Sequence, residues 1–190
     1  MAERKRQLVR DELGEVALRM FAFKGFENTT IDEIVAAAGV SRRTFFRYFK
    51  SKEDVIIASV GDMGEYVQAE LAGRPPGEPP SEAIRQALRT AMTEVTDHPE
   101  KSKALIRLMD GSPALKGRYL ERLDGLAREL APLLAARASR SAGDSRSLVL
   151  AMVAVHLNAL ALLQWAEQDG AEEPAALLDR AFAEAAAALS

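Results

Sequence analysis

The segment from Ser41 to Lys52 carries the side chains best suited to bind a polyanion. It holds five Lys or Arg residues and no Asp or Glu, although the whole chain has a net charge of −3. Guanidinium groups, hydroxyls and phenols bond to guanine edges and to phosphate oxygens. The candidates for such contacts are Ser41, Arg42, Arg43, Thr44, Arg47, Tyr48 and Lys52.

The charge is unevenly distributed along the chain. Residues 1–54 hold 11 Lys and Arg against 9 Asp and Glu, whereas residues 55–190 hold 14 against 19. Three arginines on a helix can simply form a solvated face. A binding role for these arginines therefore depends on the elements that position them.

The first of these elements is a helix. Apolar residues between Leu13 and Phe21 recur with helical spacing, which predicts a helix at about residues 3–24. Gly25 then stands where a left-handed C-terminal cap is expected. The chain should therefore turn at this glycine.

The next two helices follow closely. Thr30 and Glu33 form a capping box that starts the second helix, which stops at Gly39. Ser41 can cap a third, short helix through about Phe49. Two helices joined by a short glycine turn are typical of a helix-turn-helix, whose second helix enters the major groove. Its core would consist of Ile34, Val40, Phe45 and Phe49.

The rest of the chain also predicts helices. Ser51 can cap a fourth helix, which ends before a loop with four prolines between residues 73 and 80. Further helices are expected at about residues 81–97, 99–110, 113–138, 145–167 and 174–189. No stretch alternates with the period of a strand. We therefore expect an all-α fold of about nine helices, with a three-helix DNA-binding domain at 1–50 and a larger helical bundle at 51–190.

The C-terminal bundle is rich in adaptable and aromatic side chains. Most such residues serve as ordinary core, but together they also suit an apolar ligand pocket with a few polar groups. The candidates for lining such a pocket are Met63, Tyr66, Met92, Leu105, Met109, Tyr119, Met152, His156 and Trp165.

His156 and Asn158 lie in an otherwise apolar helix. An unpaired polar group buried there would cost about 1 to 3 kcal/mol. Two interpretations stay open: each side chain bonds to nearby backbone, or one of them faces a cavity.

The N-terminal part of the sequence resembles a known family. Gly25-Phe26, Thr29-Thr30, residues 37–41 and residues 44–53 are similar to the N-terminal signature of the TetR family of bacterial repressors. The resemblance implies a nine-helix dimer in which helices one to three bind a near-palindromic DNA site. Helices four to seven would enclose an effector pocket, and helices eight and nine would form the dimer interface.

The resemblance also implies roles for single residues. Phosphate contacts fall on Thr29, Thr44, Tyr48 and Lys52, and base contacts fall on Arg42, Arg43 and Phe45. The chain departs from the family where Arg43 replaces a residue that is often small, and where Phe46 replaces a tyrosine. For dimerisation, the last helix offers an apolar stripe made of Leu178, Ala181, Phe182, Ala185 and Leu189.

Several classes of function are not supported. The chain has no cysteine, no metal-ligand spacing and no phosphate-binding glycine loop, so we expect neither an enzyme nor a cofactor. The N-terminus lacks the apolar region of a signal peptide, and the apolar stretch 148–163 is too short for a membrane span. These features favour a cytoplasmic protein, with that stretch as a buried helix.

We therefore expect a transcriptional repressor that a small apolar or amphipathic ligand releases from its operator. An alternative is a DNA-binding regulator without such an effector, which a partner protein controls or which acts as an activator. A third is a scaffold that merely carries a helix-turn-helix. A ligand-sized cavity would favour the first over the second, and retention on DNA at low salt would exclude the third.

Overall fold

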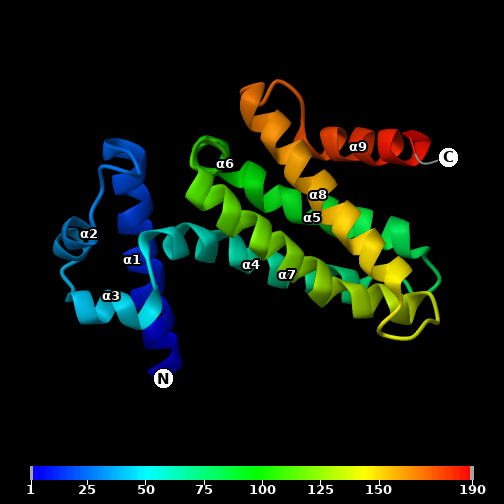
Figure 1. The fold of residues 1–190 in the computed structure, drawn as a ribbon, viewed down its shortest axis with the longest axis horizontal. Helices are drawn as coiled ribbons and strands as arrows, with labels where there is room; N and C mark the ends of the chain where they lie inside the picture. Colours follow the sequence, from blue (N-terminus) through cyan, green and yellow to red (C-terminus); the bar gives the residue numbers. More distant parts are fainter. Residues whose placement is uncertain (1, 189–190) are drawn as a thin grey trace. The chain divides into compact units, whose positions relative to one another are not determined.

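The computed structural model describes residues 2–188, without the side chains of 2–7, 59–63 and 94, and every regular element in it is a helix (Figure 1). The all-α prediction is thus confirmed. Two compact units comprise residues 1–60 and 61–190. The helices are α1 (Ala2–Lys24), α2 (Ile31–Ala37), α3 (Arg42–Tyr48), α4 (Lys52–Gly73), α5 (Pro80–Asp97), α6 (Pro99–Gly111), α7 (Pro113–Arg137), α8 (Ser145–Glu167) and α9 (Pro174–Ala188).

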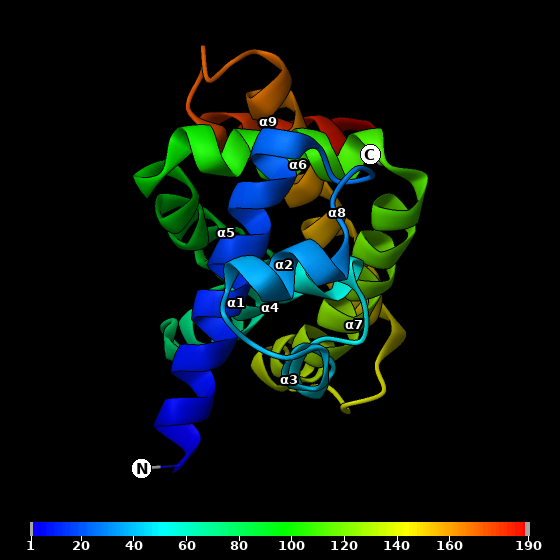
Figure 2. The same cartoon turned by 90° about the vertical axis from the view of Figure 1, so that its left-hand side faces the viewer.

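The predicted start and stop signals of unit 1 are confirmed. Gly25 has φ +88°, a left-handed conformation that ends α1. Thr30 and Glu33 form the capping box of α2, and the Ser41 hydroxyl accepts a hydrogen bond from the Thr44 backbone at the start of α3. Figure 2 shows α2 lying across the view and α3 seen end on, so the two helices cross steeply.

The side chains of unit 1 pack around an aromatic core. Phe45 and Ile34 are fully buried, and Phe49 is nearly so. The ring of Phe45 lies 5.6 Å from that of Phe49, centroid to centroid. This packing holds α3 against α2, so the opposite face of α3 is directed outward.

Glu33 makes the stability of unit 1 sensitive to acid. Hydrogen bonds from Lys24 and from the Thr30 backbone and hydroxyl lower the pKa of Glu33 from 4.5 to about 2. Because the pKa is depressed in the folded state, the carboxylate stabilises that state fully above about pH 4.5, and the contribution disappears as the pH falls towards 2. Urea unfolding between pH 6 and pH 2 should show a shallower acid loss for Glu33→Gln than for the wild type. Parallel pH profiles would contradict this assignment.

Unit 2 is organised around α8, which contacts α6, α7 and α9. Its core combines leucines and alanines from α5, α7, α8 and α9, and Figure 1 shows these helices forming one bundle. The α7 helix approaches α4 at Gly64, where a Cβ atom would collide with the guanidinium of Arg122. Gly64 therefore permits a close contact between α4 and α7.

Two positively charged side chains of α6 contact the C-terminal end of α8. Arg107 Nε lies 3.1 Å from the carbonyl oxygen of Ala166, and Lys103 Nζ lies 3.0 Å from a carboxylate oxygen of Asp169. Positive charge is favourable there because the last carbonyls of a helix have no partners within it. This network joins α6 to the turn between α8 and α9.

Candidate nucleic-acid interface and ligand cavity

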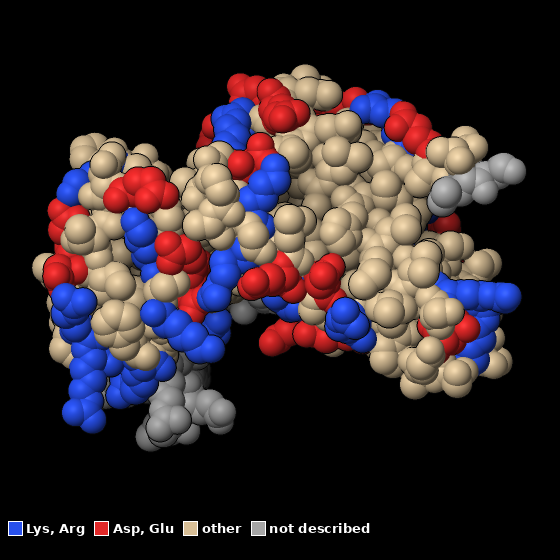
Figure 3. Space-filling model, in the orientation of Figure 1, with Lys and Arg blue, Asp and Glu red and all other residues tan. Residues whose placement is uncertain are grey.

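The outward face of α3 is exposed and basic. Arg42, Arg43, Arg47 and Lys50 are all exposed, and neither Arg43 nor Lys50 has a side-chain ion pair in the described part of the chain. Figure 3 shows Lys and Arg side chains gathered over α3. Such a surface attracts phosphates, since each bound cation releases counterions from the nucleic acid.

Arg42 is oriented by α2. Its Nη1 atom lies 3.0 Å from each carboxylate oxygen of Asp32. The other N–H groups of the guanidinium have no hydrogen-bond partner among the described residues. Arg42 can therefore keep this contact while it presents donors to the O6 and N7 atoms of a guanine.

Two further pairs arrange the hydroxyl groups of α3. Arg47 donates to the Tyr48 hydroxyl at 2.9 Å, and its guanidinium lies 4.8 Å from the centroid of the Tyr48 ring. The Tyr48 proton therefore stays available for a phosphate oxygen. The hydroxyls of Ser41 and Thr44 lie 2.9 Å apart, at the N-terminal end of the same helix.

Lys52 has a local role in the structure. Its ammonium donates to the Phe26 carbonyl at 2.7 Å and lies 4.3 Å from the centroid of the Phe26 ring. The side chain thus ties the first turn of α4 to the loop between α1 and α2. A phosphate contact by Lys52 would come in addition to this tie.

Two residues predicted to contact DNA lie inside unit 1 instead. Thr29 is 1% exposed, and its hydroxyl donates to the Gly25 carbonyl at 2.8 Å. Phe45 is completely buried against α2. Neither side chain reaches the surface in this structure, because the packing of the three helices requires both of them inside.

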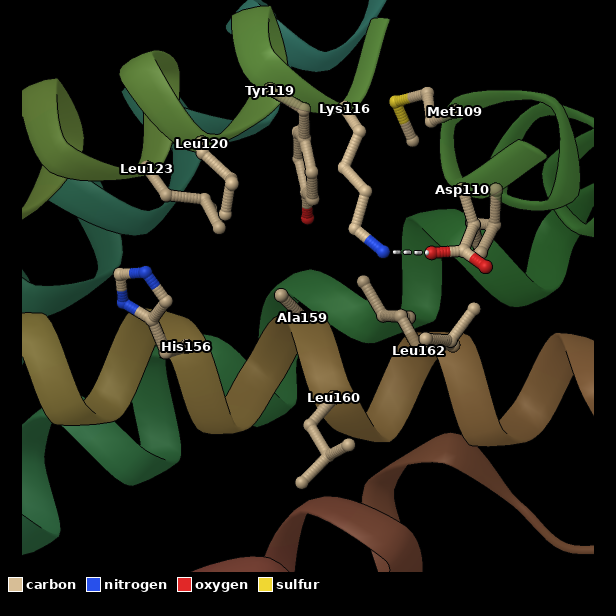
Figure 4. Close-up of a pocket in the computed structure, with 12 residues that line it drawn as sticks. Met109, Asp110, Lys116, Tyr119, Leu120, Leu123, His156, Ala159, Leu160 and Leu162 are labelled. Carbon is tan, nitrogen blue, oxygen red and sulfur yellow. Dashed lines mark hydrogen bonds and ion pairs between the residues drawn. The ribbon is translucent and has the colours of Figure 1, made fainter. Parts of the chain in front are cut away.

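A cavity of about 150 Å³ lies between α6, α7 and α8 (Figure 4). Leucine, isoleucine, methionine and alanine side chains make up most of its wall. Its polar groups are the Lys116–Asp110 ion pair, with Nζ and Oδ1 2.8 Å apart, the Tyr119 hydroxyl and the His156 ring. His156 Nδ1 lies 2.8 Å from the Met152 carbonyl oxygen. The sequence left open whether His156 bonds to nearby backbone or faces a cavity, and in the structure its ring does both.

The cavity includes three of the predicted lining residues, namely Met109, Tyr119 and His156. Met92 and Trp165 instead belong to the buried core, and Tyr66 and Met152 pack against that core. Leu105 is partly buried away from the cavity. The side chain of Met63 lies outside the described residues.

The outer face of α8 is apolar and largely uncovered. Val149 is 59% exposed and Leu160 is 45% exposed, with Val153 and Leu157 between them on the same side of the helix. Figure 3 shows few charged side chains over α8. The prediction of a buried helix is thus only partly correct, since 28% of the most apolar 18-residue window of α8 is buried.

By length and composition alone, α8 is the one helix in the described residues that could cross a membrane. Its mean hydropathy is 1.9. A single helix of this kind is weak evidence for a membrane span, because a helix in the interface or core of a globular protein has the same composition. The packing of α8 with α6, α7 and α9 favours a helix of a globular protein over a membrane span.

The apolar stripe predicted on α9 faces its own bundle. Leu178 is completely buried and Ala181 nearly so. Phe182 packs partly against the core of unit 2, and Ala185 is partly exposed. Leu189 lies outside the described residues. A second copy of the chain would therefore contact α9 through other positions than Leu178 and Ala181.

Both units match known sequence families. Residues 13–58 match the family described as "Bacterial regulatory proteins, tetR family", and residues 78–190 match the one described as "MftR C-terminal domain". The chain belongs to the TetR family. TetR-family members are helix-turn-helix transcriptional regulators, which agrees with the exposed basic face of α3.

One relative extends the similarity beyond the DNA-binding unit. The HTH-type transcriptional regulator TcmR of Streptomyces glaucescens is 36% identical over 143 residues, which are 72% of this chain and 63% of TcmR. The chain thus spans less than two thirds of the length of the curated relatives that it matches.

Solved TetR-family structures share the fold. FadR of Thermus thermophilus, a repressor crystallised with lauroyl-CoA, is 25% identical over 90% of both chains with a TM-score of 0.61. A TetR-family regulator from Syntrophomonas wolfei is 19% identical over 93% of this chain and 92% of its own, with a TM-score of 0.69.

Beside the side chains predicted to contact DNA, the structure places three residues that were not among the sequence-based candidates. Lys50 is exposed beside α3, Phe46 is 47% exposed on α3, and Asp32 contacts Arg42. Asp32 is ten positions from Arg42 and on another helix, so no periodic signal connects the two. Lys50 was detectable, because it belongs to the basic segment.

Proposed function

We propose that this protein is a dimeric repressor that binds a near-palindromic operator through α3 and leaves it when a small apolar or amphipathic ligand occupies the cavity of unit 2. The observation that carries the ligand-controlled part is the cavity between α6, α7 and α8. The similarity to FadR, whose structure contains lauroyl-CoA, supports the same interpretation. Such a regulator would act in the cytoplasm, where the DNA is.

The exposed face of α8 supports the dimeric part of the proposal. An apolar strip from Val149 to Leu160 is unfavourable in water and is typical of a surface that another protein covers. A second copy of α8 offers the same strip, so a two-fold interface would cover both.

A mechanical connection between cavity and DNA runs through α7 and α4. Tyr119 and Leu123 line the cavity, and Arg122 between them contacts Gly64 of α4. The same α4 helix begins at Lys52, which holds the loop that precedes α2. A shift of α7 would therefore move α4, the helix whose first turn holds this loop. Complete release needs about 5.5 kcal/mol of differential affinity of the ligand for the released conformation.

The test begins with the selection of genomic DNA fragments by the purified protein. Binding to the selected fragment should weaken steeply as salt rises, because α3 on each protomer neutralises phosphates. A chemically diverse library is then screened by thermal shift, and DNA binding is measured again with every stabilising compound. At least one of them should release the DNA.

Ala159→Phe provides a matched control for release. Ala159 lines the cavity on α8, so a larger side chain there fills part of its volume without touching α3. The variant should bind the selected DNA like the wild type and no longer respond to the compound. If no stabilising compound weakens DNA binding, the regulator without a small-molecule effector is the better account.

A further inference from the structure

The size of the cavity limits what it can enclose. Its volume of about 150 Å³ is well below the 300 to 1,000 Å³ typical of sites for drug-sized ligands. An apolar protein cavity of this volume holds benzene. Because Leu120, Leu160 and His156 in its wall are exposed, the cavity is open on one side, and the part of a ligand that it covers is about the size of a single ring.

Tyr119 supplies an unused hydrogen-bond donor at the cavity. Its hydroxyl makes no hydrogen bond to the described residues, and Figure 4 shows it reaching from α7 towards α8 beside Ala159. Desolvation raises the pKa of Tyr119 to about 12, so the phenol keeps its proton at physiological pH. A ligand atom that meets this group must accept a hydrogen bond.

The Lys116–Asp110 ion pair leaves no surplus positive charge on Lys116 for an anion. The ammonium of Lys116 is already paired with the carboxylate of Asp110 (Figure 4). At His156, Nδ1 faces the Met152 carbonyl, which can only accept, so Nδ1 carries a hydrogen. A ligand carboxylate would therefore meet the carboxylate of Asp110 in the cavity wall.

We propose that the cavity binds a neutral, one-ring or similarly small apolar compound whose carbonyl oxygen accepts a hydrogen bond from Tyr119. This inference rests on the proposed function, in which the same cavity holds the effector. It goes further by naming the polarity, the size and the hydrogen-bonding group of that effector.

Three probes of similar size separate the possibilities. Acetophenone has a ring and a carbonyl, ethylbenzene has the ring without an acceptor, and benzoate has the ring with a charge. Their dissociation constants for the purified protein can be measured by ligand-observed NMR, without DNA. Acetophenone should bind about fivefold more tightly than ethylbenzene, since one net hydrogen bond has about that effect. Benzoate should bind more weakly than acetophenone.

Tyr119→Phe tests the named donor. It removes the hydroxyl and keeps the ring, so acetophenone should fall to the affinity of ethylbenzene while ethylbenzene binding stays unchanged. An unchanged preference for acetophenone in this variant would overturn the role of Tyr119. If the variant does not fold, the wild-type ranking decides alone.

Binding and release are read separately, which keeps this inference distinct from the proposed function. Equal binding of acetophenone and ethylbenzene, tightest binding of benzoate, or no binding of any probe would overturn the inference. Acetophenone binding with the expected ranking supports the inference even where the DNA stays bound. In that case only the ligand-released mechanism fails.

Discussion

Replacing Leu160 by Glu should convert the protein from a dimer to a monomer and weaken operator binding by at least about a hundredfold. Leu160 is 45% exposed at the end of the apolar strip of α8, where it also lines the rim of the cavity. A carboxylate buried in a two-fold interface would lose its hydration without gaining a cation. A monomer also loses the second half-site contact, which commonly contributes two or more orders of magnitude to affinity.

Multi-angle light scattering at micromolar concentration measures the first effect, and fluorescence anisotropy with the selected DNA measures the second. Ala104→Glu is the control, because Ala104 is exposed on α6, away from the face of α8. It should leave both the dimer and the DNA affinity unchanged. A dimer that survives Leu160→Glu would place the interface elsewhere.

Arg42→Ala should reduce operator affinity and relax sequence preference at one base position of each half-site. The guanidinium, oriented by Asp32, has free donors on the exposed face of α3. Loss of a paired contact to guanine costs about 1 to 3 kcal/mol per half-site. Two half-sites then lose about 2 to 6 kcal/mol, which is about 30-fold in affinity or more.

Competition binding against a set of single-base operator variants measures this effect. Lys50→Ala is the matched control, because its exposed ammonium can meet a phosphate and should weaken all sequences about equally. If Arg42→Ala kept the full sequence preference while unit 1 stayed folded, another residue would read the base.

Local signals in the sequence were sufficient to predict the helices of unit 1. The capping box of Thr30 and Glu33, the Ser41 cap and the turn at Gly25 all depend on residues within four positions of one another. Such signals do not depend on tertiary contacts. The exposed arginines of α3 could likewise be predicted, because Phe45 and Phe49 fix the buried face.

The differences between the sequence-based predictions and the structure arise from contacts between residues that are distant in the sequence. The exposed face of α8 has no clear periodic signal, because most residues of that helix are apolar. The burial of Leu178 depends on how α9 lies against α5 and α8. The lining of the cavity depends on three helices at once. Composition therefore identified Tyr119 and His156 as lining residues, but it could not show that Trp165 belongs to the buried core instead.

Hydroxyl-radical footprinting on the selected operator fragment tests the central claim most directly. Two protomers that each place α3 in a major groove should protect two equivalent tracts, related by two-fold symmetry and centred about one helical turn or a multiple of a turn apart. The account predicts this symmetric pattern, together with its loss when Arg42 is replaced by Ala. A single asymmetric tract, or protection that persists unchanged in the Arg42→Ala variant, would contradict it.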